Sequence, residues 1–202
     1  RWSRRPSGRS NDIPTRRSCR GSRPEEREAC RAFLAPFRPL FADPSKVKIG
    51  HNAKFDLTIL RQYGVEVRGD LHDSMLAHYV IDASDRHGMD HLARQYLRYN
   101  PIPITDLIGE KKKGVEQGNM GDLPPEQICD YAAEDADVTL QLDRHLRKEA
   151  DAAGCARALS ECEEPLIPVL LDMESDGIRV DAEALRRYGR ELDRELLDLE
   201  IK

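Results

Sequence analysis

An acidic side chain that could hold a metal ion occurs at the end of the segment GHNAKFD, residues 50–56. The pattern predicts a short strand at 47–50 and a helix at 54–63 that is closed by Gly64. Asp56 therefore falls in the first turn of the helix, where the helix dipole and free backbone N–H groups stabilise a carboxylate. This placement alone favours a carboxylate that only stabilises the helix over a metal ligand.

A second cluster lies in the segment YAAEDAD, residues 131–137. Tyr131 and Asp135 are four residues apart, so they share one face of a helix. Small alanines beside them leave room for another molecule. Asp135 could ligate a metal ion while the Tyr131 hydroxyl orients a metal-bound water. Periodicity alone instead favours a solvated acidic helix face with a half-buried tyrosine.

The elements that must position these residues mix short strands with helices, and the composition suits an α/β or a mostly helical protein. A helix is expected from Pro24, interrupted by Pro36 and Pro39, with a buried stripe of Phe33, Phe37 and Phe41. The remaining expected elements are a strand within 65–71, helices at 73–81 and 89–97, a loop at 100–121, a long helix from 123 to about 153, and helices at 165–175 and from 181 onward.

Charge is distributed unevenly along the 202 residues, whose net charge is −5. Residues 1–31 contain ten arginines and four acidic residues, a balance of +6 that leaves −11 for the rest. A strongly acidic region does not suit a nucleic-acid binder, unless the acids hold cations. Residues 1–23 are rich in Arg, Ser, Pro and Gly, and two interpretations stay open: a disordered basic arm, or a segment from another reading frame.

Cysteine usage and hydropathy narrow the class of protein. The five cysteines are odd in number and form no C-x-x-C pair, so a disulfide framework or a zinc site is not expected, and a reducing cytoplasm is the natural compartment. No apolar run approaches the roughly 18 residues of a membrane span. His51, His78, His87 and His91 have no familiar metal-ligand spacing and are interpreted as structural or surface residues.

Five sequence segments, in order, resemble the 3′–5′ proofreading exonuclease domain of the bacterial DNA polymerase I family, the family A DNA polymerases. GHNAKFD at 50–56 resembles its second motif, and YAAED at 131–135 resembles its third. Between them, DSMLAHY at 73–79 and RHGMDHLA at 86–93 resemble two further family segments. The segment from Glu164 to Asp181 resembles the start of the polymerase domain.

The resemblance implies a ribonuclease-H-like α/β fold of the DEDDy exonuclease type, with an incomplete sheet. The expected division is an atypical Arg-rich segment at 1–23, an exonuclease domain lacking its first strands at 24–154, a hinge at 155–163, and helices that begin a polymerase domain at 164–202. The implied reaction is hydrolysis of the terminal phosphodiester at a single-stranded 3′ end of DNA by two divalent cations, Mg²⁺ with Mn²⁺ or Zn²⁺ as alternatives.

The resemblance also assigns roles by matched position. Asp135 would ligate the metal that activates the water, Tyr131 would position that water, and Asp56 would hold the second metal. Further residues expected to contact the substrate are Asn52, Lys54, Arg86 and Ile104, although Ile104 could equally be a core residue. Lys111–Lys113 could contact phosphates, but a solvated loop is favoured there. The implied partners are primer-template DNA and the rest of a polymerase chain, with a monomeric, nucleoid-associated protein.

One family motif is missing from the sequence. The family carries a D-x-E on the opening strand of its sheet, and no D-x-E precedes Asp56. The acid pair Glu26 and Glu28 lies in a predicted helix and has the wrong first residue. We therefore expect weak metal binding, an unpaired edge at the 47–50 strand, and a chain that is inactive and poorly stable alone.

Two other functions remain open at this level. The fold could be a non-catalytic scaffold beside a polymerase domain, although such a scaffold has no physical need for Asp56, Tyr131 and Asp135 together. It could also be a stand-alone ribonuclease of the same fold. The polymerase-like segment from Glu164 onward argues against that second alternative.

Overall fold

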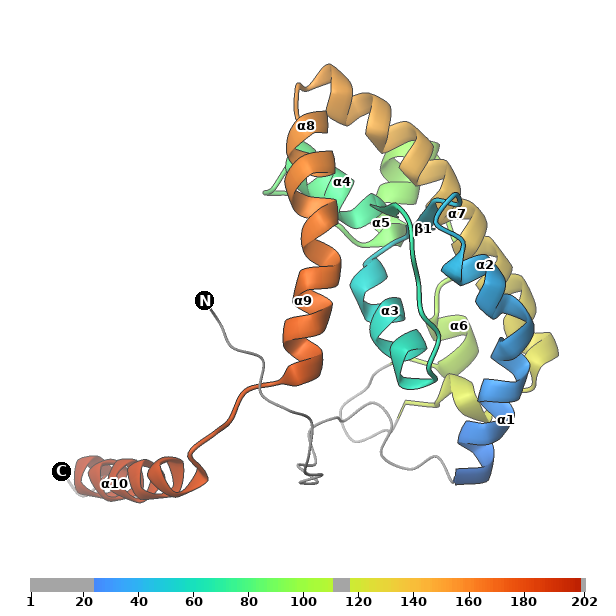
Figure 1. Ribbon diagram of the computed structural model, residues 1–202. Coiled ribbons are helices and arrows are strands. Elements are labelled where there is room, and N and C mark those ends of the chain that lie inside the picture. Colours follow the sequence, from blue (N-terminus) through green and yellow to red (C-terminus); the bar gives the residue numbers. More distant parts are fainter. Residues whose placement is uncertain (1–23, 111–116, 201–202) are drawn as a thin grey trace, which may run out of the picture.

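The computed structural model describes residues 24–110 and 117–200. Among them, helices surround a parallel sheet of two strands, β1 (Lys48–Gly50) and β2 (Leu71–Asp73), joined through α3 (Ala53–Gln62). Lys48 pairs with Leu71, Ile49 with His72, and Gly50 with Asp73. Figure 1 shows α3 and the long α7 (Pro125–Ala152) on either side of this small sheet.

The sequence accounts for where these elements begin and end. Gly64 has a φ of +74°, the left-handed conformation that commonly follows the last turn of a helix, and it closes α3 as expected. Asp73 caps α4 (Ser74–Ile81) by accepting hydrogen bonds from the first-turn amides. Pro125 opens α7, at a position where the missing N–H costs nothing. The remaining helices are α1 (Pro24–Leu34), α2 (Arg38–Ala42), α5 (Met89–Leu92), α6 (Thr105–Ile108), α8 (Ala156–Ala158), α9 (Glu164–Asp176) and α10 (Ala182–Glu200), with 3₁₀ turns at Ala35–Phe37 and Met120–Asp122 and π turns at Ala93–Leu97 and Leu159–Glu163.

The hydrophobic core lies where α4 packs against α7. Its buried residues come from four segments and include Ala77, Leu92, Leu142, Leu146 and Leu159, each no more than 1% exposed. Leu159 belongs to the segment predicted as a hinge, yet residues 156–163 are helical and continue directly into α9. The segment is therefore a packed connection between α7 and α9, whereas the domain boundaries themselves stay a prediction.

Three expectations about individual elements are wrong. The predicted buried stripe is open to solvent, with Phe33 72% and Phe37 45% exposed, because few described residues contact α1. The second strand forms at Leu71–Asp73 rather than around Val65. The 100–121 loop contains the short helix α6. The helix predicted at 89–97 is confirmed, with α geometry at Met89–Leu92 and π geometry at Ala93–Leu97.

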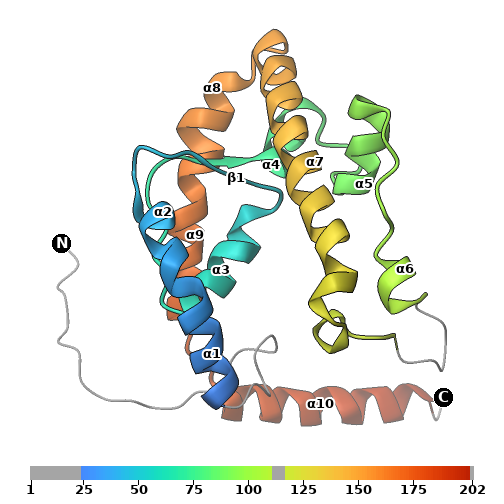
Figure 2. The same cartoon turned by 90° about the vertical axis from the view of Figure 1, so that its right-hand side faces the viewer.

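The last helix differs from the others in its surroundings. α10 lies apart from the other helices in Figure 1, at the lower left, and runs along the bottom of Figure 2. None of its residues is buried. The leucines of its apolar face, Leu185, Leu192, Leu196 and Leu199, are all exposed. In the described ranges, no helix combines the length and apolarity needed to cross a bilayer.

Candidate metal-dependent nuclease site

The strand–helix junction that carries Asp56 is tightly constrained. β1 ends at Gly50, where an added Cβ would lie 2.9 Å from the Cβ of Ala53, so only glycine fits without a shift. Asn52 follows in the left-handed conformation, with φ 62° and ψ 47°, which asparagine tolerates better than most residues. This sharp turn starts α3 at Ala53 and places Asp56 in its first turn.

Asp56 and Asp135 line the same cavity, although 79 positions separate them in the sequence. The cavity has a volume of about 650 Å³ and lies between β1, the start of α3 and the middle of α7. Gly50 and Thr139 also line it. Tyr131 lies one turn before Asp135 on α7, is half-buried, and hydrogen-bonds to the Asp135 carboxyl. The two sequence clusters therefore meet at one site.

The electrostatics of the site favour a bound cation. Loss of hydration raises the pKa of Asp56, although its side chain reaches solvent, and the nearby negative charge of Asp73 raises it further. Desolvation also raises the pKa of Asp135, while the hydrogen bond from Tyr131 acts in the opposite direction. Desolvation and the Asp135 charge raise the pKa of the Tyr131 hydroxyl. Carboxylates that lack compensating positive charge are suited to hold a hard divalent cation.

The described residues supply only part of a metal site. Carboxylate oxygens are the ligands that Mg²⁺ prefers, so Asp56 and Asp135 fit the chemistry of such an ion. However, no group of three or more His, Cys, Asp or Glu side chains in the described ranges is arranged to hold a metal. The donor set is thus compatible with a divalent cation and insufficient for two.

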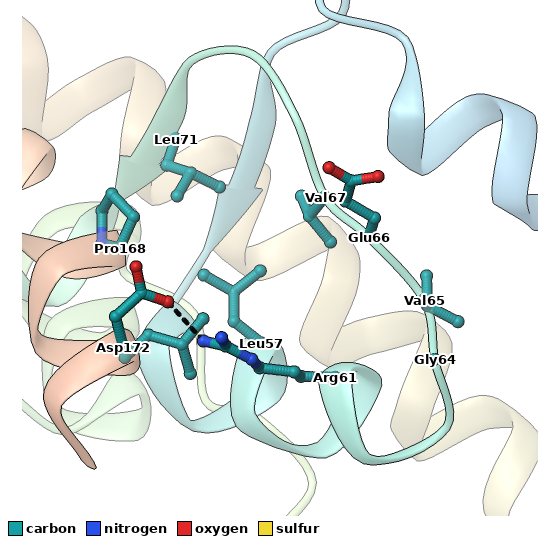
Figure 3. A pocket seen from close by; sticks show the side chains of 10 residues that line it. Leu57, Arg61, Gly64, Val65, Glu66, Val67, Leu71, Pro168 and Asp172 are labelled. Carbon is teal, nitrogen blue, oxygen red and sulfur yellow. Dashed lines mark hydrogen bonds and ion pairs between the residues drawn. The ribbon is translucent and has the colours of Figure 1, made fainter. Parts of the chain in front are cut away.

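Lys54, expected to contact substrate, instead directs its ammonium toward α9. It forms an ion pair with Glu174, and Arg61, two turns further along α3, forms one with Asp172. Figure 3 shows the second pair across a cavity of about 420 Å³ between α3 and α9, which Leu57 and Pro168 also line. The positively charged face of α3 is therefore bound to α9 in this structure, and a substrate contact by Lys54 stays a prediction.

The other expected substrate residues lie at the surface. Asn52 is exposed at the start of α3, and Arg86 is exposed in the loop before α5. Ile104 is 41% exposed just before α6, which does not suit a core residue. Neither Arg86 nor Ile104 lines the cavity of Asp56 and Asp135. Lys111–Lys113 lie outside the described residues.

Several buried polar residues that support the site were missed by sequence reasoning. Asp73 is 2% exposed and accepts hydrogen bonds from the backbone amides of Asn52 and Ala53. Ser74 bridges the same junction, because its hydroxyl donates to the Gly50 carbonyl and lies 2.9 Å from Nδ1 of His51. Asp before a helix indicates a cap, so the role toward α4 could be predicted. The contacts to α3 could not, because they need the register of the two strands.

Comparison with known proteins agrees with this geometry. Residues 23–151 match the family model described as the 3′–5′ exonuclease of family A DNA polymerases. DNA polymerase I of Pseudomonas aeruginosa is 40% identical over 173 residues, 84% of this chain and 19% of the relative. DNA polymerase I of Rhizobium leguminosarum is 40% identical over 163 residues, 80% of this chain and 16% of the relative. The chain thus spans less than a fifth of the length of these curated relatives.

Solved structures support the same fold. The POL domain of Pol1 from M. smegmatis, in complex with DNA primer-template and dNTP, superimposes with a TM-score of 0.62 at 25% identity, covering 87% of this chain and 26% of that one. Brucella melitensis NrnC superimposes with a TM-score of 0.54 at 21% identity, covering 69% and 63% of the two chains. Because the family model matches residues 23–151, more than half of this chain, the chain belongs to the 3′–5′ exonuclease domains of family A DNA polymerases.

Proposed function

We propose that this chain is the proofreading portion of a DNA polymerase I, built to hydrolyse the 3′-terminal phosphodiester of single-stranded DNA and release a deoxynucleoside monophosphate. One observation carries the proposal: Asp56 and Asp135, from segments far apart in the sequence, line a single cavity beside Tyr131. A scaffold has no physical need for two carboxylates that line one cavity beside a tyrosine hydroxyl.

The residues of the site have distinct tasks in this reaction. Asp135 and Asp56 would hold divalent cations, which polarise the phosphate and lower the pKa of the attacking water. Tyr131 orients that water, because its hydroxyl lies next to the Asp135 carboxyl. Asn52, exposed at the start of α3, offers an amide to the terminal nucleotide. Primer-template DNA and the rest of a polymerase chain are the proposed partners.

The 202-residue chain by itself is proposed to be inactive. Mg²⁺ is usually held by one or two carboxylates together with substrate oxygens and water, so two carboxylates shared between two cations would hold both ions weakly. The edge of β1 opposite β2 has no partner strand among residues 24–110 and 117–200, and Ile49 in that strand is 37% exposed. A strand carrying D-x-E would pair at this edge and add its carboxylates to the cavity.

The test is to supply that strand. The segment of P. aeruginosa DNA polymerase I that precedes its matched region is fused before Pro24, and shortening of a 5′-labelled single-stranded oligonucleotide is measured with Mg²⁺ or Mn²⁺. We expect no shortening by the chain alone. The fusion should shorten the oligonucleotide from its 3′ end, and Asp135→Ala should lower its rate by roughly 100-fold or more, because a lost ligand removes transition-state charge stabilisation.

Two controls separate the alternatives. Asp137→Ala removes an exposed carboxylate from the same helix without touching the cavity, and it should leave the rate of the fusion unchanged. If the fusion folds and binds the oligonucleotide but does not shorten it, the exonuclease hypothesis is wrong and the non-catalytic scaffold is the better explanation. Activity of the unfused chain that Asp135→Ala abolishes would refute the proposed inactivity.

A further inference from the structure

Asp73 occupies an unusual position at the end of β2. It is 2% exposed and caps its own helix, α4, because its Oδ1 accepts hydrogen bonds from the amides of Met75 at 2.9 Å and Leu76 at 3.3 Å. Capping of this kind is common, since the first amides of a helix have no intrahelical acceptor. An aspartate does not have to be buried to cap a helix: Asp181 accepts hydrogen bonds from the first-turn amides of α10 and is exposed.

The same carboxylate also caps a second helix, α3. Asn52 donates its backbone N–H to Oδ1 at 3.1 Å, and Ala53 donates its own to Oδ2 at 2.7 Å. Asn52 occupies the N-cap position of α3 but makes no side-chain capping bond. The left-handed conformation of Asn52 has its own energetic cost. Asp73 therefore supplies, from a neighbouring strand, the acceptors that the start of α3 lacks.

A further set of contacts connects Asp73 to α7. The backbone N–H of Asp73 donates to Oε1 of Glu164, the first residue of α9, at 3.3 Å. Glu164 is buried and forms an ion pair with Arg147 of α7, and Nε of Arg147 donates to Asp143 at 2.9 Å. Asp56 lies on α3 and Asp135 on α7, so this network joins the two helices that carry the candidate metal ligands.

We infer that Asp73 is a positioning residue of the exonuclease site, which fixes the first turn of α3, and Asp56 with it, relative to Asp135 on α7. The inference rests on the proposed function for the roles of Asp56 and Asp135. Asp73 does not line their cavity, and the contacts by which it fixes α3 are the hydrogen bonds from the amides of Asn52 and Ala53. This positioning is geometric and is separate from the effect of the Asp73 charge on the pKa of Asp56.

Two substitutions separate the two caps. Asp73→Asn keeps one oxygen for the amides that Oδ1 serves but turns an NH₂ group toward the Ala53 N–H. Asp73→Ser keeps an acceptor for α4, since serine is a good N-cap residue, but its single hydroxyl does not reach α3. Amide hydrogen exchange of the 202-residue chain, resolved by NMR, should be roughly tenfold faster at Ala53 in both variants and also at Asn52 in Asp73→Ser, because each of these donors then loses its partner. The retained oxygen of Asp73→Asn still accepts from Asn52.

Asp143→Asn is the matched control. Asp143 is 4% exposed and lies at the α7 end of the same network, where its carboxylate contacts Arg147 and His72. Asp143→Asn keeps an oxygen for Arg147 and leaves the pair of Arg147 with Glu164 and the contacts of Asp73 to α3 in place. In Asp143→Asn, the rates of amide hydrogen exchange at Asn52 and Ala53 should stay within twofold of those in the unmodified chain. If either Asp73 variant leaves these two amides unchanged, the inference is overturned. It is also overturned if both variants accelerate exchange at Leu142 and Leu146 of α7 equally, because Asp73 would then support only the fold as a whole.

A distance measurement tests positioning directly. Spin labels are attached through an unnatural amino acid at Phe55 and Ala132, which are exposed neighbours of Asp56 and Tyr131. The distance distribution between them should broaden in Asp73→Asn and Asp73→Ser but not in Asp143→Asn, and an unchanged distribution would contradict the inference. Neither readout requires catalysis, so an inactive fusion protein would refute the proposed function while leaving this result standing.

Discussion

The two carboxylates of the site belong to two differently built halves of the molecule. Asp135 lies on α7, whose Leu142 and Leu146 are fully buried against α4 and the turn at Leu159. Asp56 lies on α3, beside the edge of β1 that has no partner strand among the described residues, and large apolar side chains here and on α1 reach solvent. The exposed ones are Phe33, Phe37, Val47, Ile49 and Phe55. We call these the packed half and the open half.

The difference shows that the site is held by two kinds of force. Apolar burial fixes α7, and it contributes roughly 25 cal/mol per Å² of buried apolar surface. Directed polar contacts fix the start of α3: hydrogen bonds to Asp73, and ion pairs from Lys54 and Arg61 to α9. Polar contacts at a surface are individually weak, so we expect Asp56 to be the less firmly placed of the two ligands.

The largest expected effect is a contrast between the cores of the two halves. Leu142→Ala should lower the free energy of unfolding by about 2–5 kcal/mol, because it leaves a cavity in the packed half. Phe33→Ala in the open half should change it by less than about 0.5 kcal/mol, since its side chain is 72% exposed. Urea unfolding followed by circular dichroism measures both. A comparable loss in the two variants would show that the phenylalanine is covered in solution.

Acid should act on the two halves in opposite directions. In the packed half, desolvation and then the charge of His87 lower the pKa of buried His78 below its usual 6.5. Asp85, Asp82 and His91 also face this imidazole, and Nδ1 of His78 lies 2.8 Å from Nδ1 of His87, so two protonated rings would oppose N–H to N–H. In the open half, burial raises the pKa of Asp56 above its usual 3.8.

The sign follows from which state binds more protons. Below pH 6.5 His78 binds a proton more readily in the unfolded chain than in the folded chain. The free energy of unfolding therefore falls as the pH drops from 6.5 through the lowered pKa of the folded state. The slope is at most about 1.4 kcal/mol per pH unit for one proton. Protonation of Asp56 above pH 3.8 favours the folded state and partly offsets this loss. Unfolding free energies between pH 8 and 5 should fall for the unmodified chain and stay flatter for His78→Asn. If the free energy of unfolding falls equally steeply with pH in the unmodified chain and in His78→Asn, His78 is not the cause of the acid destabilisation.

Much of this architecture could be predicted from the sequence, because its signals are local. Gly64 marks the end of α3 and Pro125 the start of α7, and the spacing of Tyr131 and Asp135 places both on one helix face. The meeting of the GHNAKFD and YAAED segments at one cavity agrees with the motif order. Local chemistry decides the ends of the helices and the shared helix face. The meeting of the two segments is a distant contact, and only the resemblance to the family indicated it.

What could not be predicted depends on contacts between distant segments. The stripe of Phe33 and Phe37 has helical spacing, but spacing does not show whether a neighbour covers it. The segment 155–163 is predicted as a hinge, but Leu159 belongs to the buried cluster of α4 and α7 residues and holds the segment in the core. Lys54 pairs with Glu174, 120 positions away, and only the packing of α9 on α3 brings the two together.

The smallest expected effect concerns the ion pairs between α3 and α9. The double variant Asp172→Asn, Glu174→Gln removes both negative charges while keeping side-chain size. Because the four side chains are between 33% and 69% exposed, we expect a loss of about 0.4–2 kcal/mol for the two pairs together at low salt. The loss should shrink in about 1 M NaCl, where the Debye length is about 3 Å.

A control from the same chain separates charge from position. Arg157→Gln breaks the exposed pair with Glu161, which does not join α9 to α3, and it should leave hydrogen exchange in the first turn of α3 unchanged. The double variant should accelerate exchange there while leaving Leu142 and Leu146 protected. If salt does not alter the loss, shape complementarity between α3 and α9 rather than charge holds the open half. The position of Asp56 would then depend on packing, as the position of Asp135 does.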